Sequence, residues 1–285
     1  MKWIVRILGG LLVIVCVAVL AIYVASNRII NQRHDFQEHP VTVPSDSASV
    51  AEGARFARIR CMGCHGDSLK GKVFFDAPMI ARLIAPNVPA KLASLSDGEF
   101  AGFLRSGVRK DGTSPFVMPP PGFYHISDHD LGALIAFIRS LPQPEHDLPA
   151  TRLRLLGRFG LLAGQFTTAV AGFDTTAERI GDDPAWATSR KGEYLARIQC
   201  TECHGLRLTG ASASDDDMGT PSLSGAFGYS LEEFVTLVRT GTPRDTARKL
   251  TLMAEVARGS LTHFTDDEIA AVYGYLKALP ATGVK

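Results

Sequence analysis

Two segments of the chain, Cys61-Met62-Gly63-Cys64-His65 and Cys200-Thr201-Glu202-Cys203-His204, share one pattern and lie 139 residues apart. In each segment two cysteines three positions apart are followed directly by a histidine. Residues three apart lie on one face of a helical turn, so both thiols of a pair can reach the same bound group. The pattern therefore predicts attachment through two sulfur atoms, with an imidazole nitrogen left to bind a metal.

Cys-x-x-Cys-His is the attachment motif of c-type haem. The two cysteines form thioethers with the vinyl groups of the porphyrin, and the histidine, His65 or His204, is one axial ligand of the iron. A zinc ribbon needs four ligands around one metal at a spacing of about 15 to 20 residues. A thioredoxin-like dithiol follows a strand in a βαβ pattern, which neither segment does. We therefore expect two covalently attached haem c groups.

Composition places limits on the remaining possibilities. A chain of 285 residues is long enough for about two domains. Four of the five cysteines belong to the two motifs, and the fifth, Cys16, lies in the apolar N-terminal run, so no pair is left for a structural disulfide. The net charge of +1 does not create the basic field that nucleic-acid binding requires.

The N-terminal region is typical of a membrane anchor. The run from Ile7 to Ala25 is uncharged and contains only apolar or small residues. At 1.5 Å per residue it can span a hydrocarbon core of about 30 Å. We predict a transmembrane signal-anchor over residues 1–27. A cleaved signal peptide is the alternative, because Val24-Ala25-Ser26 resembles a small-x-small cleavage site.

Residues 28–50 are polar and contain two prolines, which predicts a tether between the anchor and the first domain. Basic residues flank the apolar run on both sides, so the positive-inside rule does not decide its orientation. We expect the c-type haem groups to be attached outside the cytoplasm, by resemblance to other proteins with this motif. This places the N-terminus inside and the haem domains in the periplasm of a bacterial inner membrane crossed once.

The two halves of the chain repeat one another beyond the motifs. The segment 57–61 matches 196–200, and 69–71 matches 208–210. Capping boxes precede apolar stretches at Ser96, Ser230 and Thr265, with a close variant at Ser127. The final stretch of each half has apolar residues at helical spacing and stops at Leu-Pro. Neither half shows a convincing strand pattern, so we expect a mainly α fold of two small helical domains.

Each half resembles a class I c-type cytochrome domain, and the tandem resembles the membrane-anchored dihaem cytochromes of bacterial respiratory chains, including the cytochrome c subunits of respiratory dehydrogenases. The domains expected from this resemblance are 51–142 and 188–282, joined by a linker over 143–187. In that family the first and last helices cross, with a glycine meeting an aromatic residue. The resemblance assigns these places to Gly53 with Phe137 and to Gly192 with Tyr275.

The linker contains four leucines that indicate a short helix packed on one of the domains. They are Leu153, Leu156, Leu161 and Leu162.

Each iron needs a second axial ligand. In the first half the candidate is Met118, in Phe116-Val117-Met118-Pro119-Pro120-Pro121, because consecutive prolines favour an extended loop that can hold a thioether against the haem. His125 is the alternative. The second half has no Met-Pro, and there we assign Met253, with His263 as the alternative. Thioether ligation raises the reduction potential relative to two imidazoles.

Residues around the ligands are assigned by resemblance alone. The family uses a proline carbonyl to accept the second N–H of the ligand imidazole, and Pro86 and Pro221 occupy that position. Arg105 and Arg239, each in Arg-x-Gly, are the candidates for contacts with haem propionates.

Two ligands on each iron leave single-electron exchange as the chemistry available. We therefore expect an electron carrier. Its donor would be a membrane dehydrogenase or a quinol-oxidising complex, and its acceptor a terminal oxidase or a soluble cytochrome. The alternative is a dihaem enzyme, either a peroxidase or a sulfur-compound oxidase, with one exchangeable axial site. The sulfur-oxidising family uses a cysteine ligand, and outside the motifs this chain offers only Cys16.

Overall fold

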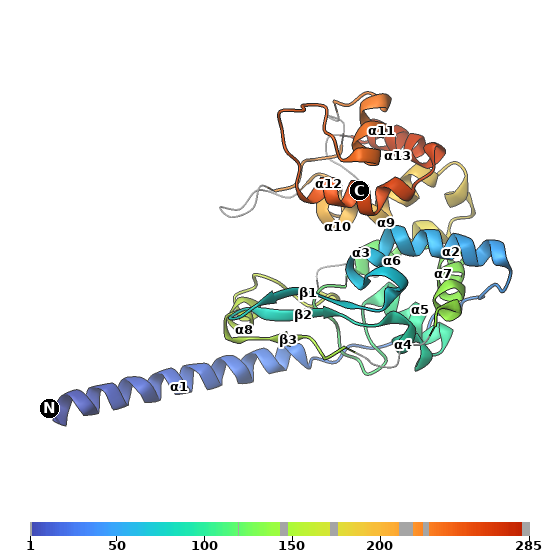
Figure 1. The fold of residues 1–285 in the computed structure, drawn as a ribbon. Helices are drawn as coiled ribbons and strands as arrows, with labels where there is room; N and C mark the ends of the chain where they lie inside the picture. Colours follow the sequence, from blue (N-terminus) through green and yellow to red (C-terminus); the bar gives the residue numbers. More distant parts are fainter. Residues whose placement is uncertain are drawn as a thin grey trace.

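A computed structural model of the chain describes residues 2–118, 120–142, 148–171, 176–210, 219–224 and 228–280 (Figure 1). Its elements are mainly helical, which confirms the predicted fold class. Pro119 of the proline-rich loop, the start of the linker at 143–147 and the end of the second domain at 281–282 lie outside the described residues.

The chain begins with one long helix, α1 (Lys2–Ile30), which projects away from the rest of the molecule (Figure 1). Its most apolar window has a mean hydropathy of 3.0 and is 0% buried. By length and composition α1 can cross a membrane. The helix continues to Ile30, three residues past the predicted end of the anchor, and the polar segment follows from there.

The polar segment after α1 lies along the first domain. The amide nitrogen of His34 donates to the carbonyl of Gly112 (2.9 Å), and that of His39 donates to the carbonyl of Gly98 (3.0 Å). Val41 packs against the hydrophobic core. The polar segment has the composition of a flexible spacer, but these contacts hold it on the surface of the first domain.

The first domain is built around two crossing helices, α2 (Ser47–Arg60) and α7 (Asp128–Ser140). The shorter helices between them are α3 (Met62–His65), the 3₁₀ turn η1 (Asp67–Leu69), α4 (Val88–Ala93), α5 (Asp97–Ser106) and α6 (Pro120–Tyr124). Their apolar side chains form one buried core that includes Phe56, Leu104 and Ile135.

The second domain repeats this plan. Its crossing pair is α9 (Lys191–Gln199) with α13 (Asp266–Ala278). The elements between them are α10 (Thr201–His204), α11 (Leu231–Thr240), α12 (Leu252–Gly259) and η4 (Leu261–His263). Many buried residues of both domains belong to one continuous hydrophobic core, so the two repeats pack directly against each other.

The four predicted helix starts are confirmed. Ser96, Ser230 and Thr265 each accept from the amide three residues on, and the glutamate at that position bonds back in each case. Ser127 accepts from the amide of Asp130, but the carboxylate of Asp130 bonds elsewhere, as described below.

The first domain also contains a small sheet, which the sequence pattern did not indicate. β1 (Lys72–Ala77) and β2 (Ala81–Ala85) form an antiparallel hairpin, and β3 (Arg152–Leu153) pairs with β2. Five of the six residues of β1 are exposed. Because the strand has no buried face, its sequence lacks the alternation of apolar and polar residues by which strands are recognised.

The linker is part of the first domain over most of its described length. β3 completes the sheet, and the expected short helix is α8 (Leu155–Leu162), which packs against α1. Two 3₁₀ turns, η2 (Ile180–Asp182) and η3 (Pro184–Ala187), then lead into α9.

Glycine allows the helices of each pair to cross closely. A Cβ atom added at Gly53 would lie 1.9 Å from the carbonyl oxygen of Ala133, and one added at Gly192 would lie 2.1 Å from that of Ala271. Tyr275 lies against Gly192, as the resemblance implies. At Gly53 the nearest atoms belong to the backbone of Ala133 and Leu134, one turn before Phe137.

Replacing Gly53 by alanine is expected to destabilise the protein by about 2 kcal/mol, because the two helix backbones must move apart. The free energy of unfolding of the haem-loaded protein in urea measures this change. Gly274→Ala is the matched control, since a Cβ there meets nothing within 4 Å, and it should leave stability unchanged or slightly raised. Equal midpoints for Gly53→Ala and the wild type would contradict the close crossing.

Candidate functional site

Each histidine of the two motifs is oriented by a proline carbonyl. His65 Nδ1 lies 2.8 Å from the carbonyl oxygen of Pro86, and His204 Nδ1 lies 2.8 Å from that of Pro221. A carbonyl can only accept, so Nδ1 carries the proton and Nε2 keeps its lone pair. Each imidazole is thereby prepared to bind a metal through Nε2.

The backbone after each motif follows the same path. Leu69 and Leu208 adopt left-handed conformations with φ of 58° and 57°, which is uncommon for a residue with a side chain. The amide nitrogen of Gly71 donates to the carbonyl of His65 (2.7 Å), and that of Gly210 donates to the carbonyl of His204 (2.9 Å). The repeated path brings each proline carbonyl to the same place beside its histidine.

Both imidazoles are buried, with 9% of His65 and 8% of His204 exposed. Burial lowers the pKa of each imidazole, and the hydrogen bond to the proline carbonyl opposes this effect. The result is a neutral imidazole near pH 7, which is the form that binds a metal.

The first cysteine of each motif is also buried. Burial raises the pKa of Cys61 and of Cys200 to about 12. Reactive dithiols have lowered thiol pKa values, so these pairs lack the electrostatics of a redox-active disulfide.

The donor set of each motif suits haem c better than a bare metal ion. Among the described residues no group of three or more His, Cys, Asp or Glu side chains could hold a metal ion. What each motif provides is one oriented imidazole and two thiols on a helical turn, with an apolar core beside them. Such a set can fix a porphyrin covalently and bind its iron on one side.

Both methionine candidates pack against this core. Met118 lies just before α6, and Met253 is the second residue of α12. The alternative His125 accepts at Nδ1 from the amide nitrogen of Ile180 (3.3 Å). His263 lies in η4, and its carbonyl accepts from Arg55 (3.2 Å). Because Nδ1 of His125 uses its lone pair to accept this bond, the neutral ring carries its proton on Nε2 and has no free lone pair for iron.

The arginines assigned to propionates occupy equivalent positions. Arg105 donates to the carbonyl of Ile126 (2.8 Å) and to Asp128 (2.7 Å). Arg239 donates to the carbonyl of Phe264 (2.7 Å) and to Asp266 (2.6 Å). Both guanidinium groups therefore fasten α5 or α11 to the start of the last helix of the domain. Contact with a propionate stays a prediction.

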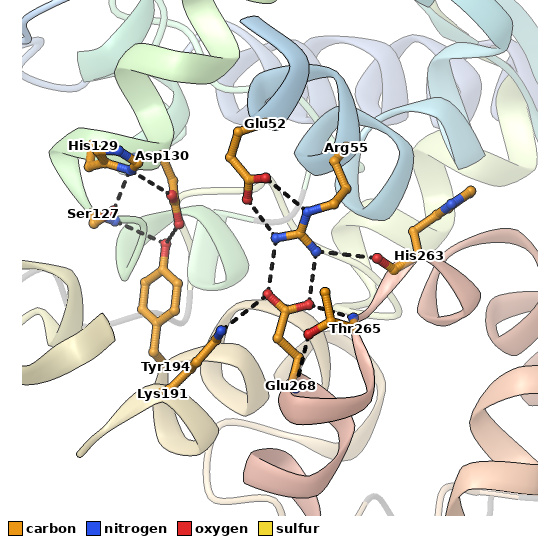
Figure 2. Close-up of polar contacts among 10 residues, drawn as sticks. All are labelled: Glu52, Arg55, Ser127, His129, Asp130, Lys191, Tyr194, His263, Thr265 and Glu268. Atoms are coloured by element: carbon orange, nitrogen blue, oxygen red, sulfur yellow. Dashed lines mark hydrogen bonds and ion pairs between the residues drawn. The ribbon is translucent and has the colours of Figure 1, made fainter. Parts of the chain in front are cut away.

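The interface between the repeats uses equivalent positions twice (Figure 2). Arg55 of α2 forms two hydrogen bonds to Glu268 of α13 (2.8 and 3.0 Å). Tyr194 of α9, the counterpart of Arg55, donates to Asp130 of α7 (2.5 Å), the counterpart of Glu268. Burial raises the pKa of the Asp130 carboxyl, and the Tyr194 hydroxyl opposes this effect. The two domains thus meet through exchanged contacts, as the halves of a two-fold symmetric dimer do.

The two haem motifs lie beside each other at this interface. Arg60, directly before the first motif, donates to Gln199, directly before the second (3.0 Å). The same guanidinium lies 3.5 Å from Glu202 inside the second motif and 4.9 Å above the ring of Phe123. Only 3% of the Arg60 side chain is exposed.

Sequence reasoning missed Arg55, Tyr194, Asp130 and Arg60. The repeat aligns Arg55 with Tyr194 and Asp130 with Glu268, but the residue types differ, so the alignment did not indicate a shared role. Asp130 and Glu268 were visible only as capping residues.

Comparison with known proteins agrees with this site. Residues 50–142 match the family model of cytochrome c, and residues 187–276 match that of cytochrome c oxidase, cbb3-type, subunit III.

Several curated relatives are cytochrome subunits of dehydrogenases. The cytochrome c subunit of the quinone-linked alcohol dehydrogenase of Gluconobacter oxydans is 28% identical over 83% of this chain and 56% of its own length. The gluconate 2-dehydrogenase cytochrome c subunit of Pantoea cypripedii is 29% identical over 83% and 61%. The fructose dehydrogenase cytochrome subunit of Gluconobacter japonicus is 25% identical over 85% and 55%. The chain thus spans less than two thirds of the length of these relatives.

The duplicated Cys-x-x-Cys-His motifs, the oriented histidines and the two family matches agree with one another. The chain is a dihaem c-type cytochrome with two tandem cytochrome c domains, similar to the cytochrome c subunits of several dehydrogenases.

Proposed function

We propose that this cytochrome transfers single electrons from a membrane-associated dehydrogenase or quinol-oxidising complex to a terminal oxidase or soluble cytochrome. Haem c supplies reversible one-electron exchange at iron. The protein holds the two groups, shields them from water and provides the surfaces that meet the donor and the acceptor.

The observation that carries this proposal is the contact between the two motifs. Arg60 and Gln199 directly precede the two motifs, and Nη1 of Arg60 donates to Oε1 of Gln199 (3.0 Å). Two haems attached at these motifs would lie on either side of one continuous hydrophobic core. This arrangement supports a relay in which an electron received by one domain passes to the other.

The ligands support electron transfer over catalysis. His65 with Met118, and His204 with Met253, would fill both axial positions of each iron. An iron without an open position exchanges electrons but does not bind a substrate. The packing of both methionines against the core favours this closed state.

The relatives support a dehydrogenase as donor, since the three described above are cytochrome subunits of dehydrogenases. The apolar α1 supports a position at the bacterial inner membrane, with the haem domains on the periplasmic side. In this arrangement the anchor keeps the relay close to a membrane-bound donor.

Met118→Ala tests the ligand assignment and the proposed function together. The purified variant is expected to lose the weak long-wavelength absorption of the iron–thioether bond for one haem. It should also bind carbon monoxide at that haem and show a lower reduction potential. Spectra recorded during a reductive titration measure all three changes. Met79→Ala is the matched control, because Met79 lies in the hairpin turn and 55% of it is exposed.

The wild-type protein should not bind carbon monoxide. Binding at either native haem would reveal an exchangeable axial site and would favour the enzyme alternative. Unchanged spectra in Met118→Ala would remove that residue from the ligand set.

A further inference from the structure

The helix α8 has an apolar outer face. Leu156, Phe159 and Leu162 recur at intervals of three residues and are 51%, 56% and 37% exposed. A helix on the surface of a soluble domain normally turns its polar side outward. The outward face of α8 is apolar, and contact with an apolar neighbour would remove this face from water.

The hairpin turn extends this apolar surface. Met79 and Ile80 are 55% and 44% exposed. The amide nitrogen of Leu156 donates to the carbonyl of Met79 (3.0 Å), and that of Arg154 donates to the carbonyl of Ile80 (2.8 Å). The turn and the helix therefore form one surface, here called the α8 patch and defined by Met79, Ile80, Leu156, Phe159 and Leu162.

The α8 patch lies where α1 would leave the membrane. Arg158 of α8 donates to Ser26 and to Asn27 of α1 (2.8 Å each), and its guanidinium lies 4.3 Å above the ring of Tyr23. Tyr23 is two residues before the end of the uncharged run, about 3 Å along the helix axis. Figure 1 shows α8 at the far end of the sheet, on the side toward α1.

Apolar contacts also join the end of α1 to the sheet and to α8. Ile29 and Ile30, at the end of α1, pack against the small core formed by Ala81, Leu153 and Leu161. These contacts place the α8 patch beside the end of α1, next to the residues that would leave the bilayer.

The charge around the patch matches an anionic lipid surface. Residues 148–173 contain three arginines, at 152, 154 and 158, and no aspartate or glutamate. Arg154 forms an ion pair with Asp76 of β1 (2.9 Å), so Arg152 and Arg158 supply the remaining positive charge of this segment. Arg28 adds a further charge on the exposed end of α1. Apolar side chains flanked by arginines are typical of helices that lie in the headgroup region of a membrane.

We propose that the α8 patch is a second membrane contact, which lies in the interfacial region of an anionic bilayer and fixes the orientation of the first haem domain. This inference rests on the part of the proposed function that makes α1 a membrane anchor. A donor subunit seated on the patch is the competing occupant.

Site-specific photocrosslinking tests the contact. A benzophenone amino acid replaces Phe159 in the full-length, haem-loaded protein, which is then placed in nanodiscs of phosphatidylglycerol and phosphatidylcholine. Illumination is expected to give lipid adducts by mass spectrometry, severalfold more than from the same substitution at Leu231. Leu231 is the matched control, because it is an apolar residue of α11 with 43% exposure in the second domain.

The same substitution at Ile14, within α1, distinguishes loss of the second membrane contact from loss of the anchor. Adducts at Ile14 without adducts at Phe159 would overturn the second contact and leave the anchor intact. No adducts at either position would remove the anchor itself. Adducts at Phe159 that only match those at Leu231 would also overturn the contact, and unchanged haem absorption verifies that each variant is folded.

Discussion

Replacing both Cys61 and Cys64 by alanine is expected to remove one haem from the purified protein and to unfold the first domain. A domain of about 90 residues buries a smaller fraction of its surface than a larger domain does. We therefore expect the porphyrin to contribute a large part of the apolar core of this domain. Intact mass should show one added haem in place of two, and circular dichroism should show a loss of helix confined to roughly half of the soluble part.

The matched control is Cys16→Ala, which changes the one cysteine outside the motifs and should keep both haems. The double variant at Cys200 and Cys203 should mirror the first, with the second domain unfolded. Because the domains share one core, each double variant should also lower the melting temperature of the domain that keeps its haem. Full helix content and an unchanged melting temperature after loss of a haem would contradict the dependence of the fold on the cofactor.

Replacing Arg55 by methionine is expected to destabilise the contact between the domains by about 3 kcal/mol. Only 5% of the Glu268 side chain is exposed, and removing one partner of a buried pair leaves an uncompensated charge. The loss should fall at the lower end of the usual range because Lys191 stays 3.7 Å from the same carboxylate. Differential calorimetry of the haem-loaded protein should then resolve two transitions where the wild type shows one.

Arg58→Met is the control, since Arg58 is exposed on the same helix and its loss should leave the transition unchanged. Tyr194→Phe removes the equivalent contact to Asp130 and should act in the same direction. Its effect should be smaller, because a tyrosine hydroxyl is lost in place of a charge. A single unchanged transition in Arg55→Met would show that the paired contacts do not couple the domains.

The sequence predicted the motifs, the repeat and the helix starts because each depends on a local pattern. Two cysteines and a histidine at fixed spacing identify the haem site, and a serine three residues before a glutamate identifies a capping box. The positions of Pro86 and Pro221 beside the histidines came from family resemblance, since nothing local marks a carbonyl as an acceptor.

The parts that the sequence did not predict depend on contacts between distant segments. The hairpin was missed because Phe74 and Phe75 are both exposed and adjacent, which hides the alternation of a strand. The linker did not reveal that Leu153 extends the sheet, because a two-residue strand carries no pattern. The docking of the polar segment depends on backbone bonds from His34 and His39, which side-chain composition cannot indicate.

The exchanged contacts between the repeats have one further consequence. A homodimer must place the same residue on both sides of its axis, so its two halves are interchangeable. Covalent fusion lifts that restriction, and this chain has Arg55 with Glu268 at one position and Tyr194 with Asp130 at the other. The two domains are therefore held by different contacts on the two sides of one interface, so a single substitution can weaken one side and leave the other intact.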